Sequence, residues 1–315
     1  MIDLETLNFE AFESDLNKIY DSLKNTTGGK NADYIPALAK VDPKLYAISV
    51  FTVDGRQINI GDFKHEFAIE SCSKIFTLAL ALEKFGSNVV KKKIGATTSD
   101  KAFNSICAVE ETDGHTINSF NNSGAMATLS LLQNNKIGQQ DLTKKVINNM
   151  SQFAARTLHV NQKIFASEFS HAEHNLAIAY LLKSNNRFYG DVFTTVNAYT
   201  QQCSAMVTSC DVAIMAATLA NFGLNPKTKK RLVSAKTVEY ILDHMLVAGL
   251  YNDTDNWLTK VGLHAKSGVG GILLIVVPGI MGISIISPPL NKYGNSFKGI
   301  KTAVKIAKLL KNKNK

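Results

Sequence analysis

The spacing of hydrophobic positions changes along the chain from a helical period to a strand period. Residues 8–24 repeat apolar side chains every three or four positions, which predicts an amphipathic helix. Residues 45–53 are rich in β-forming side chains, Asp54-Gly55 is a strong turn signal, and residues 56–61 alternate on the way back. We expect these segments to form an antiparallel pair, followed by a short strand at 65–69.

The middle of the chain returns to helical spacing. Residues 75–85 predict a buried helix that ends at Gly86, because glycine suits the position after a helix C-terminus. From about residue 87 to about residue 225 the pattern is mainly helical. The segments with apolar periodicity in this region are 124–132, 172–182, 190–203 and 209–222.

Strand character comes back towards the C-terminus. Residues 272–277 and 280–286 are apolar runs separated by Pro278-Gly279, which predicts a hairpin. A last helix at about 299–311 carries apolar side chains on one face and lysines on the other. We expect its apolar face to cover a sheet.

This order of elements predicts an α+β fold with αβα layers. Strands from both ends of the chain would form one antiparallel sheet flanked by helices, with an all-helical lobe inserted between them. We expect one domain over residues 1–315, with a sheet-containing lobe at 1–75 and 225–315 and a helical lobe at about 76–224.

Composition narrows the class of protein. With 315 residues, 45% of them hydrophobic, the chain can bury a large core. The net charge of +9 lies mostly in short lysine runs without interleaved aromatic residues, so we expect no nucleic-acid partner. The four cysteines show no C-x-x-C pairing, the start from Met1 to Glu5 is acidic, and no run of eighteen apolar residues occurs. These features predict a soluble, cytoplasmic protein without a membrane segment.

One short motif carries chemistry. Ser71 is followed at i+3 by Lys74, and Lys266-Ser267-Gly268 stands at the head of a later β-like segment. A serine hydroxyl needs a neighbouring base, and a lysine one helical turn away can supply it. The backbone N–H of Ser71, if it begins a helix, could hold an oxyanion during acyl transfer. The alternative interpretation is a serine N-cap with a solvated lysine.

These motifs resemble the penicillin-recognising serine enzymes, which include β-lactamases and transpeptidases. Further strings resemble the serine-dependent glutaminase family over about residues 30–300. They are 68–80, 120–125, Ser167-Glu168 with Asn175, Tyr199 with 202–204, 217–223, 249–253, 265–271 and 287–290.

The glutaminase resemblance implies one catalytic domain with a β-lactamase-like fold. It implies hydrolysis of L-glutamine to L-glutamate and ammonia without metal or other cofactor, in a homo-oligomer. Ser71 would be the nucleophile, Lys74 its base, and Tyr251 an aid to proton transfer. The backbone N–H groups of Ser71 and Val269 would form the oxyanion hole, supported by Lys266 and Ser267. Substrate contacts would come from Tyr34, Ser71, Asn122, Glu168, Asn175, Tyr199, Tyr251 and Val269.

The implied residue types suit a free amino acid. Glutamine carries a fixed ammonium and a fixed carboxylate, so a selective pocket needs an anion for the first and hydrogen-bond donors for the second. Glu168 fits the ammonium, and the asparagines and tyrosines fit the carboxylate. Lys74 must be neutral part of the time to act as a base, and we expect burial beside Lys266 to lower its pKa.

Three positions depart from the family pattern, and several alternatives stay open. Ser123 stands where alanine is usual, Ile272 replaces a third glycine, and Glu70 precedes Ser71 where a small or amide residue is common. A metal site at Glu168, His171 and His174 would lack a fourth ligand and spread around a helix, so we expect none. Asn122 could instead cap a helix, and the tyrosines could be core residues.

The function also has alternatives. A penicillin-interactive hydrolase or carboxypeptidase would share the S-x-x-K and K-S-G motifs. A non-catalytic relative would bind glutamine without releasing ammonia.

Overall fold

The computed structural model describes residues 4, 7–98, 102, 104–110, 112, 114–133 and 138–312. The prediction of a cytoplasmic location used the acidic start of the chain, of which residues 1–3 and 5 lie outside the described set. The last three residues of the basic C-terminal end also lie outside it. No helix among the described residues combines the length and the apolar character needed to cross a membrane.

Five strands form the main sheet, in the order β2-β1-β7-β6-β5, with every neighbouring pair antiparallel. The expected assembly of one sheet from both ends of the chain is confirmed, because β1 pairs with β7. The strands are β1 (Ala47–Thr52), β2 (Gln57–Gly61), β5 (His264–Gly268), β6 (Ile272–Val277) and β7 (Met281–Ile286).

Alternation along β6 gives the sheet two buried faces. Ile272, Leu274 and Val276 join the core of the helical region, whereas Leu273 and Ile275 join a second core with the terminal helices. Successive side chains of a strand point to opposite faces, so a strand apolar at every position is buried on both sides.

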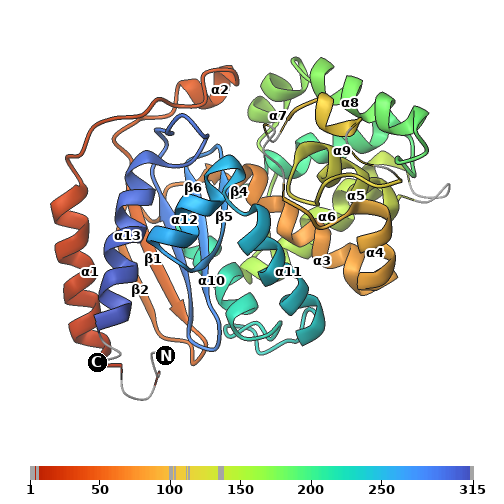
Figure 1. Cartoon of the computed structure of the whole chain (residues 1–315). Coiled ribbons are helices and arrows are strands. Elements are labelled where there is room, and N and C mark those ends of the chain that lie inside the picture. Colours follow the sequence, from red (N-terminus) through yellow and green to blue (C-terminus); the bar gives the residue numbers. More distant parts are fainter. Residues whose placement is uncertain are drawn as a thin grey trace.

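Two layers of helices cover these faces. On one face α1 (Phe9–Leu23) and α13 (Phe297–Asn312) lie side by side, as Figure 1 shows, with α12 (Thr254–Lys260) beside them. The predicted first and last helices are therefore confirmed. The other face is covered by α10 (Ser209–Ala220), and α11 (Ala235–Ala248) packs on β5.

The helical region lies beside this sandwich and contains most of the remaining helices (Figure 1). The predicted periodic segments correspond to α5 (Asn122–Leu132), α8 (Glu173–Ser184), α9 (Val192–Cys203) and α10. Contrary to the expected lobe boundary, α10 packs on the sheet, because it is apolar around its whole circumference and needs cover on every side. The remaining helices are α2 (Pro36–Ala39), α3 (Lys74–Phe85), α4 (Ser87–Ile94), α5 (Asn122–Leu132), α6 (Gln139–Ala154), α7 (Gln162–Phe169), α8 (Glu173–Ser184) and α9 (Val192–Cys203).

Short elements complete the chain. The expected strand at 65–69 is present as β3 (Phe67–Ala68), which pairs with β4 (Met206–Val207) in a separate two-stranded sheet. Three 3-10 helices occur among the described residues, η1 (Glu70–Ser73), η2 (Cys107–Val109) and η3 (Tyr251–Asp253).

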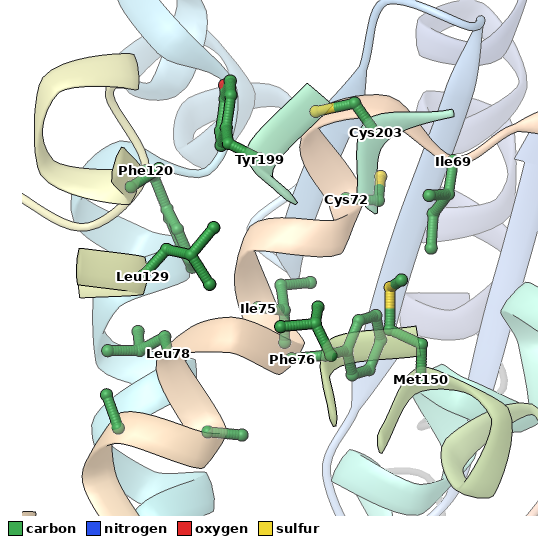
Figure 2. Close-up of a cluster of buried hydrophobic side chains, with 14 of the residues drawn as sticks. Ile69, Cys72, Ile75, Phe76, Leu78, Phe120, Leu129, Met150, Tyr199 and Cys203 are labelled. Carbon is green, nitrogen blue, oxygen red and sulfur yellow. The ribbon is translucent and has the colours of Figure 1, made fainter. Parts of the chain in front are cut away.

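A cluster of apolar side chains surrounds the first turns of α3 (Figure 2). Ile75, Phe76 and Leu78 are fully buried in it, and Phe76 packs on Phe153 with ring centroids 4.9 Å apart. The predicted buried helix is thus confirmed, and it ends at Gly86 with φ of 78°. Close packing on these sides fixes the position of the residues that precede Ile75.

Candidate active site

The segment that carries Ser71 is a strained 3-10 turn at the start of α3. Glu70 has φ of 50°, in the left-handed region that non-glycine residues rarely adopt. The Ser73 hydroxyl donates to the Glu70 carbonyl oxygen at 2.6 Å, and Gln202 Nε2 donates to Ser73 Oγ at 3.2 Å. Thr77 Oγ1 in turn donates to Gln202 Oε1 at 2.7 Å. This buried network holds the turn in place.

Lys74 follows Ser71 by one turn and is 1% exposed. Its Nζ donates to the Phe120 carbonyl oxygen at 3.0 Å and to Asn122 Oδ1 at 2.8 Å. Burial lowers the pKa of this amine to about 8, although nearby Cys203 and Glu70 act in the opposite direction. The alternative of a solvated lysine is therefore wrong, and a neutral amine is accessible near neutral pH.

Lys266 is also completely buried. Its Nζ donates to the Ser267 carbonyl oxygen at 2.7 Å and lies 4.1 Å from the ring centroid of Tyr251. Burial, and next the charge of Lys74, hold the pKa of Lys266 well below its ordinary value. We expected burial beside Lys266 to lower the pKa of Lys74. The expected direction is found, and burial is its main cause.

Tyr251 lies on the other side of the serine. Its hydroxyl donates to the Ser267 carbonyl oxygen at 3.3 Å and makes a side-chain hydrogen bond with Ser71. Burial raises the pKa of this phenol, and the bond to Ser71 only partly opposes the rise. The group therefore keeps its proton at neutral pH and can donate it.

The K-S-G motif ends its own strand, β5, instead of heading the following one as expected. A tight turn at Gly270 and Gly271 separates β5 from β6. Because this turn is so short, the sequence pattern did not show that two strands meet there. A Cβ on Gly268 would lie 2.8 Å from the Ile69 carbonyl oxygen. The end of β5 therefore packs directly on the segment before Ser71, and Val269 reaches the same cavity as Ser71.

A cavity of about 150 Å³ opens beside the serine. Seven of the residues expected at the site line it, and Lys74, Tyr251, Lys266 and Ser267 are not among the lining residues. The seven are Tyr34, Ser71, Asn122, Glu168, Asn175, Tyr199 and Val269. A second hollow of about 690 Å³ shares Tyr34 and Val269 with this cavity, but Ser71 does not line it.

Asn122 connects the amine to the polar wall of the cavity. Its Oδ1 accepts from Lys74 Nζ and from the Tyr199 hydroxyl, the latter at 3.1 Å. Its Nδ2 donates to Asn175 Oδ1 at 3.2 Å. The alternative of a helix cap is wrong, because the N-cap of α5 is Asn121 and no side chain caps it. Tyr199 is buried as a core residue, yet its hydroxyl faces this polar wall.

Two carboxyl groups also line the cavity. Glu70 and Glu168 each have a buried side-chain oxygen without a hydrogen-bond partner among the described residues. Burial raises the pKa of Glu168 to about 8, and burial together with Glu168 raises the pKa of Glu70 well above its ordinary value. Sequence reasoning missed the contact of Glu70 with the cavity, although its unusual position before Ser71 was a usable signal.

Glu168, His171 and His174, which we considered as possible metal ligands, do not form a group of potential ligand atoms. Glu168 instead lies with Glu70 and Cys203, whose potential ligand atoms are within 4.8 Å of one another. His171 Nδ1 contacts the Ser167 carbonyl oxygen, and His174 Nε2 contacts the Asn104 carbonyl oxygen. Both histidines also line the cavity, where the sequence had suggested no role for them.

The five-stranded antiparallel sheet with helices on both faces and a helical region beside it places the chain in the class of proteins with a β-lactamase-like fold. The model of the family described as Glutaminase matches residues 29–314. The chain belongs to the glutaminase family, and it is an amidohydrolase.

Individual relatives agree with this assignment. The chain is 43% identical over 291 residues to a glutaminase of Mycobacterium ulcerans (strain Agy99), covering 92% of this chain and 90% of that protein. It matches the solved structure of the probable glutaminase ybaS with a TM-score of 0.94 and 40% identity, over 97% and 98% of the two chains. A structure of Mglu in its glutamate form gives a TM-score of 0.90 at 31% identity, over 95% and 68%. These matches favour the glutaminase alternative over the penicillin-interactive one.

Proposed function

We propose that this protein hydrolyses free L-glutamine to L-glutamate and ammonia through a glutamyl ester on Ser71. The observation that carries the proposal is a serine that lines a polar cavity, is hydrogen-bonded to a protonated tyrosine and stands one helical turn before a buried lysine of lowered pKa. No step of this reaction calls for a metal or another cofactor.

The amine of Lys74 starts the reaction. In its neutral form it accepts the Ser71 proton as Oγ attacks the side-chain amide carbon of glutamine. The backbone N–H groups of Ser71 and Val269 donate to the oxyanion, and each such donor typically lowers the barrier by about 3 kcal/mol. As the C–N bond breaks, Tyr251 passes a proton to the departing ammonia and is reprotonated from Lys74. Water then attacks the ester carbon while Lys74 takes its proton. The bond between this carbon and Ser71 Oγ breaks, Lys74 returns the proton to Oγ, and glutamate leaves.

Lys266 and Ser267 support this machinery. The Ser267 carbonyl oxygen accepts from both Lys266 Nζ and the Tyr251 hydroxyl, which fixes the tyrosine beside the nucleophile. Burial and the charge of Lys74 hold the pKa of Lys266 well below its ordinary value, so this amine loses its positive charge more readily than an exposed lysine does.

The acidic and the neutral polar residues of the cavity match the two charges of a free amino acid. Glu168 receives the α-ammonium, and the α-carboxylate lies against Asn122, Asn175, Tyr199 and Tyr34. Tyr34 is 56% exposed as a residue, while its hydroxyl end is crowded enough that burial raises its pKa. The glutamate form of the related Mglu supports an amino-acid site in this fold.

The proposal extends to the setting of the enzyme. Residues 1–315 act as one catalytic domain, since the site draws on β5, η1, α5, α7 and α9 together. Free thiols at all four cysteines support a cytoplasmic location. The exposed side chains of Tyr180 and Phe193 offer apolar surface for a homo-oligomer, which light scattering on the purified protein would test.

Ammonia release is the direct test. The purified protein is expected to release ammonia from L-glutamine, and Ser71→Ala to lose this activity by a factor of about 10⁴ or more. Ser184→Ala, at an exposed position on α8, is the matched control and should keep full activity. Mass spectrometry of the quenched wild type should find a glutamyl adduct on Ser71. Undiminished turnover by Ser71→Ala would refute the proposal.

A further inference from the structure

Two buried carboxyl groups without partners face the same small cavity. Glu70 is 2% exposed. Its Oε1 and the Oε2 of Glu168 are both buried and have no hydrogen-bond partner among the described residues. No salt bridge within 4.0 Å involves either residue in the described part of the chain. Both line the cavity beside Ser71, and with Cys203 their side-chain atoms come within 4.8 Å of one another.

Such a pair of carboxyl groups lacks a positive charge to compensate it. Two carboxylates at this separation in a buried site cannot both ionise cheaply, so one keeps a proton unless a cation compensates them. Lys74 is the cationic group that acts on both carboxyl groups, and its charge lowers the pKa of each. Its Nζ is nevertheless hydrogen-bonded to Phe120 and Asn122 instead of to either carboxylate.

The other titratable groups around the pair are phenols, a thiol, a second lysine and two histidines. Burial holds the phenols and the thiol protonated and therefore neutral at neutral pH, and burial also lowers the pKa of Lys266 well below its ordinary value. The two histidines line the cavity and contact carbonyl oxygens. These groups are Tyr34, Tyr199, Cys203, Tyr251, Lys266, His171 and His174.

We propose that Glu70 is a second specificity-determining carboxylate, which together with Glu168 receives the α-ammonium of the substrate, and that the empty pair holds a proton that leaves when the ammonium binds. The proton passes to solvent, and the substrate ammonium replaces it as the positive charge between the two groups. The inference rests on the proposed function, because only an amino-acid substrate supplies this ammonium.

The pair would give selectivity that one carboxylate cannot. A ligand without an α-ammonium leaves the pair protonated and gains nothing from Glu70. Glutaramate is such a ligand, since it has the amide and the carboxylate of glutamine and lacks only the α-amino group. Glutamine binding should therefore strengthen with pH, whereas glutaramate binding should not.

Calorimetry on Ser71→Ala, which cannot form the ester, measures the displaced proton directly. Titration with glutamine at pH about 7, in two buffers of different ionisation enthalpy, should show release of roughly one proton per ligand. Glutaramate should bind with release near zero. In the double variant that carries both Ser71→Ala and Glu70→Gln, proton release with glutamine should fall by at least half. Glutaramate should still bind to this variant, and that binding shows that its site is folded. Glu13→Gln, at an exposed position on α1, should change neither value.

Steady-state kinetics give a second reading on the active enzyme. Between pH about 6 and about 8 the KM of the wild type for glutamine should fall more steeply than that of Glu70→Gln. The proposal would be overturned if proton release with glutamine were equal with and without Glu70→Gln, or if the KM profiles of the wild type and Glu70→Gln were parallel. Neither result would contradict the glutaminase activity itself. Proton release that disappears after treatment with a chelator would also overturn it, since a metal would then occupy Glu70, Glu168 and Cys203. A wild type that releases no ammonia refutes the proposed function separately.

Discussion

At the scale of single residues, the position of Ser71 depends on a hydrogen-bond network whose side chains, those of Ser73, Thr77 and Gln202, do not line the cavity. The left-handed backbone of Glu70 costs on the order of 1 kcal/mol or more, and it persists only where neighbours enforce it. Ser73 holds the Glu70 carbonyl oxygen, and Gln202 on α9 holds Ser73. Gln202 is therefore a positioning residue for the nucleophile.

Replacing Gln202 tests this network. Gln202→Leu leaves the buried hydroxyl of Thr77 without its acceptor and Ser73 without its donor, and should destabilise the fold by about 1–3 kcal/mol. If the turn also relaxes, kcat should fall by about tenfold while KM changes little, because Gln202 does not line the cavity. Melting curves and steady-state kinetics measure both effects. The adjacent Gln201→Leu is the control, and an equal loss of kcat there would contradict a specific role.

Residue spacing predicted Ser71 with Lys74 because both lie on one helical turn. The contacts that complete the site join positions far apart in the sequence, such as Lys74 with Asn122 and Glu70 with Glu168. No local period encodes those pairs, so only the family resemblance could place most of the pocket. The lowered pKa of Lys74 and its cause, burial, were predicted, whereas the opposing effects of Cys203 and Glu70 depend on contacts that the sequence does not give.

At the scale of elements, the sheet and α10 approach each other unusually closely. A Cβ on Gly282 of β7 would lie 2.1 Å from the backbone nitrogen of Ala217 and 2.4 Å from the Ala213 carbonyl oxygen. Beside this contact, Ser209 Oγ donates to Ser284 Oγ at 3.0 Å. The backbone of α10 thus rests directly on β7, which ties the inserted helical segment to the C-terminal strands.

This contact predicts the cost of a single methyl group. Gly282→Ala should destabilise the protein by about 1–3 kcal/mol or more, because rigid backbone atoms of α10 must move to admit the side chain. Ile283→Val in the same strand removes a methylene and should cost about 0.5–1.5 kcal/mol, which provides the scale. Urea denaturation measures both. A smaller loss for Gly282→Ala than for Ile283→Val would mean that α10 moves aside easily.

The elements themselves were largely predictable, because each strand and helix carries a clear hydrophobic period. What the period could not give was the partner of each element. The α10 sequence is apolar on every side, so it predicts burial but not that the sheet provides it. The strand β5 was hidden because its K-S-G end and the glycine turn merge with the apolar run of β6.

At the scale of the whole molecule, the site lies where the sheet meets the helical region, and it concentrates buried ionisable groups there. Lys74, Lys266, Glu70 and the carboxylate end of Glu168 are all removed from water. Each is costly to bury in its charged form, and the pKa values move in the directions that neutralise them. The catalytic arrangement therefore lowers the stability of the fold that holds it.

Glu168 allows that cost to be measured through pH. Burial raises its pKa from 4.5 to about 8, so the folded protein keeps a proton that the unfolded chain has already lost over this range. The stabilisation from that proton is complete below pH 4.5 and is lost as the pH rises through about 8. Glu168→Gln cannot titrate, so it should gain stability relative to the wild type by on the order of 2–4 kcal/mol between those limits, while its activity falls. Urea denaturation at both pH values measures the gain, with Glu13→Gln as the exposed control. A stability difference between Glu168→Gln and the wild type that does not change with pH would show that Glu168 is ionised without penalty in the folded protein.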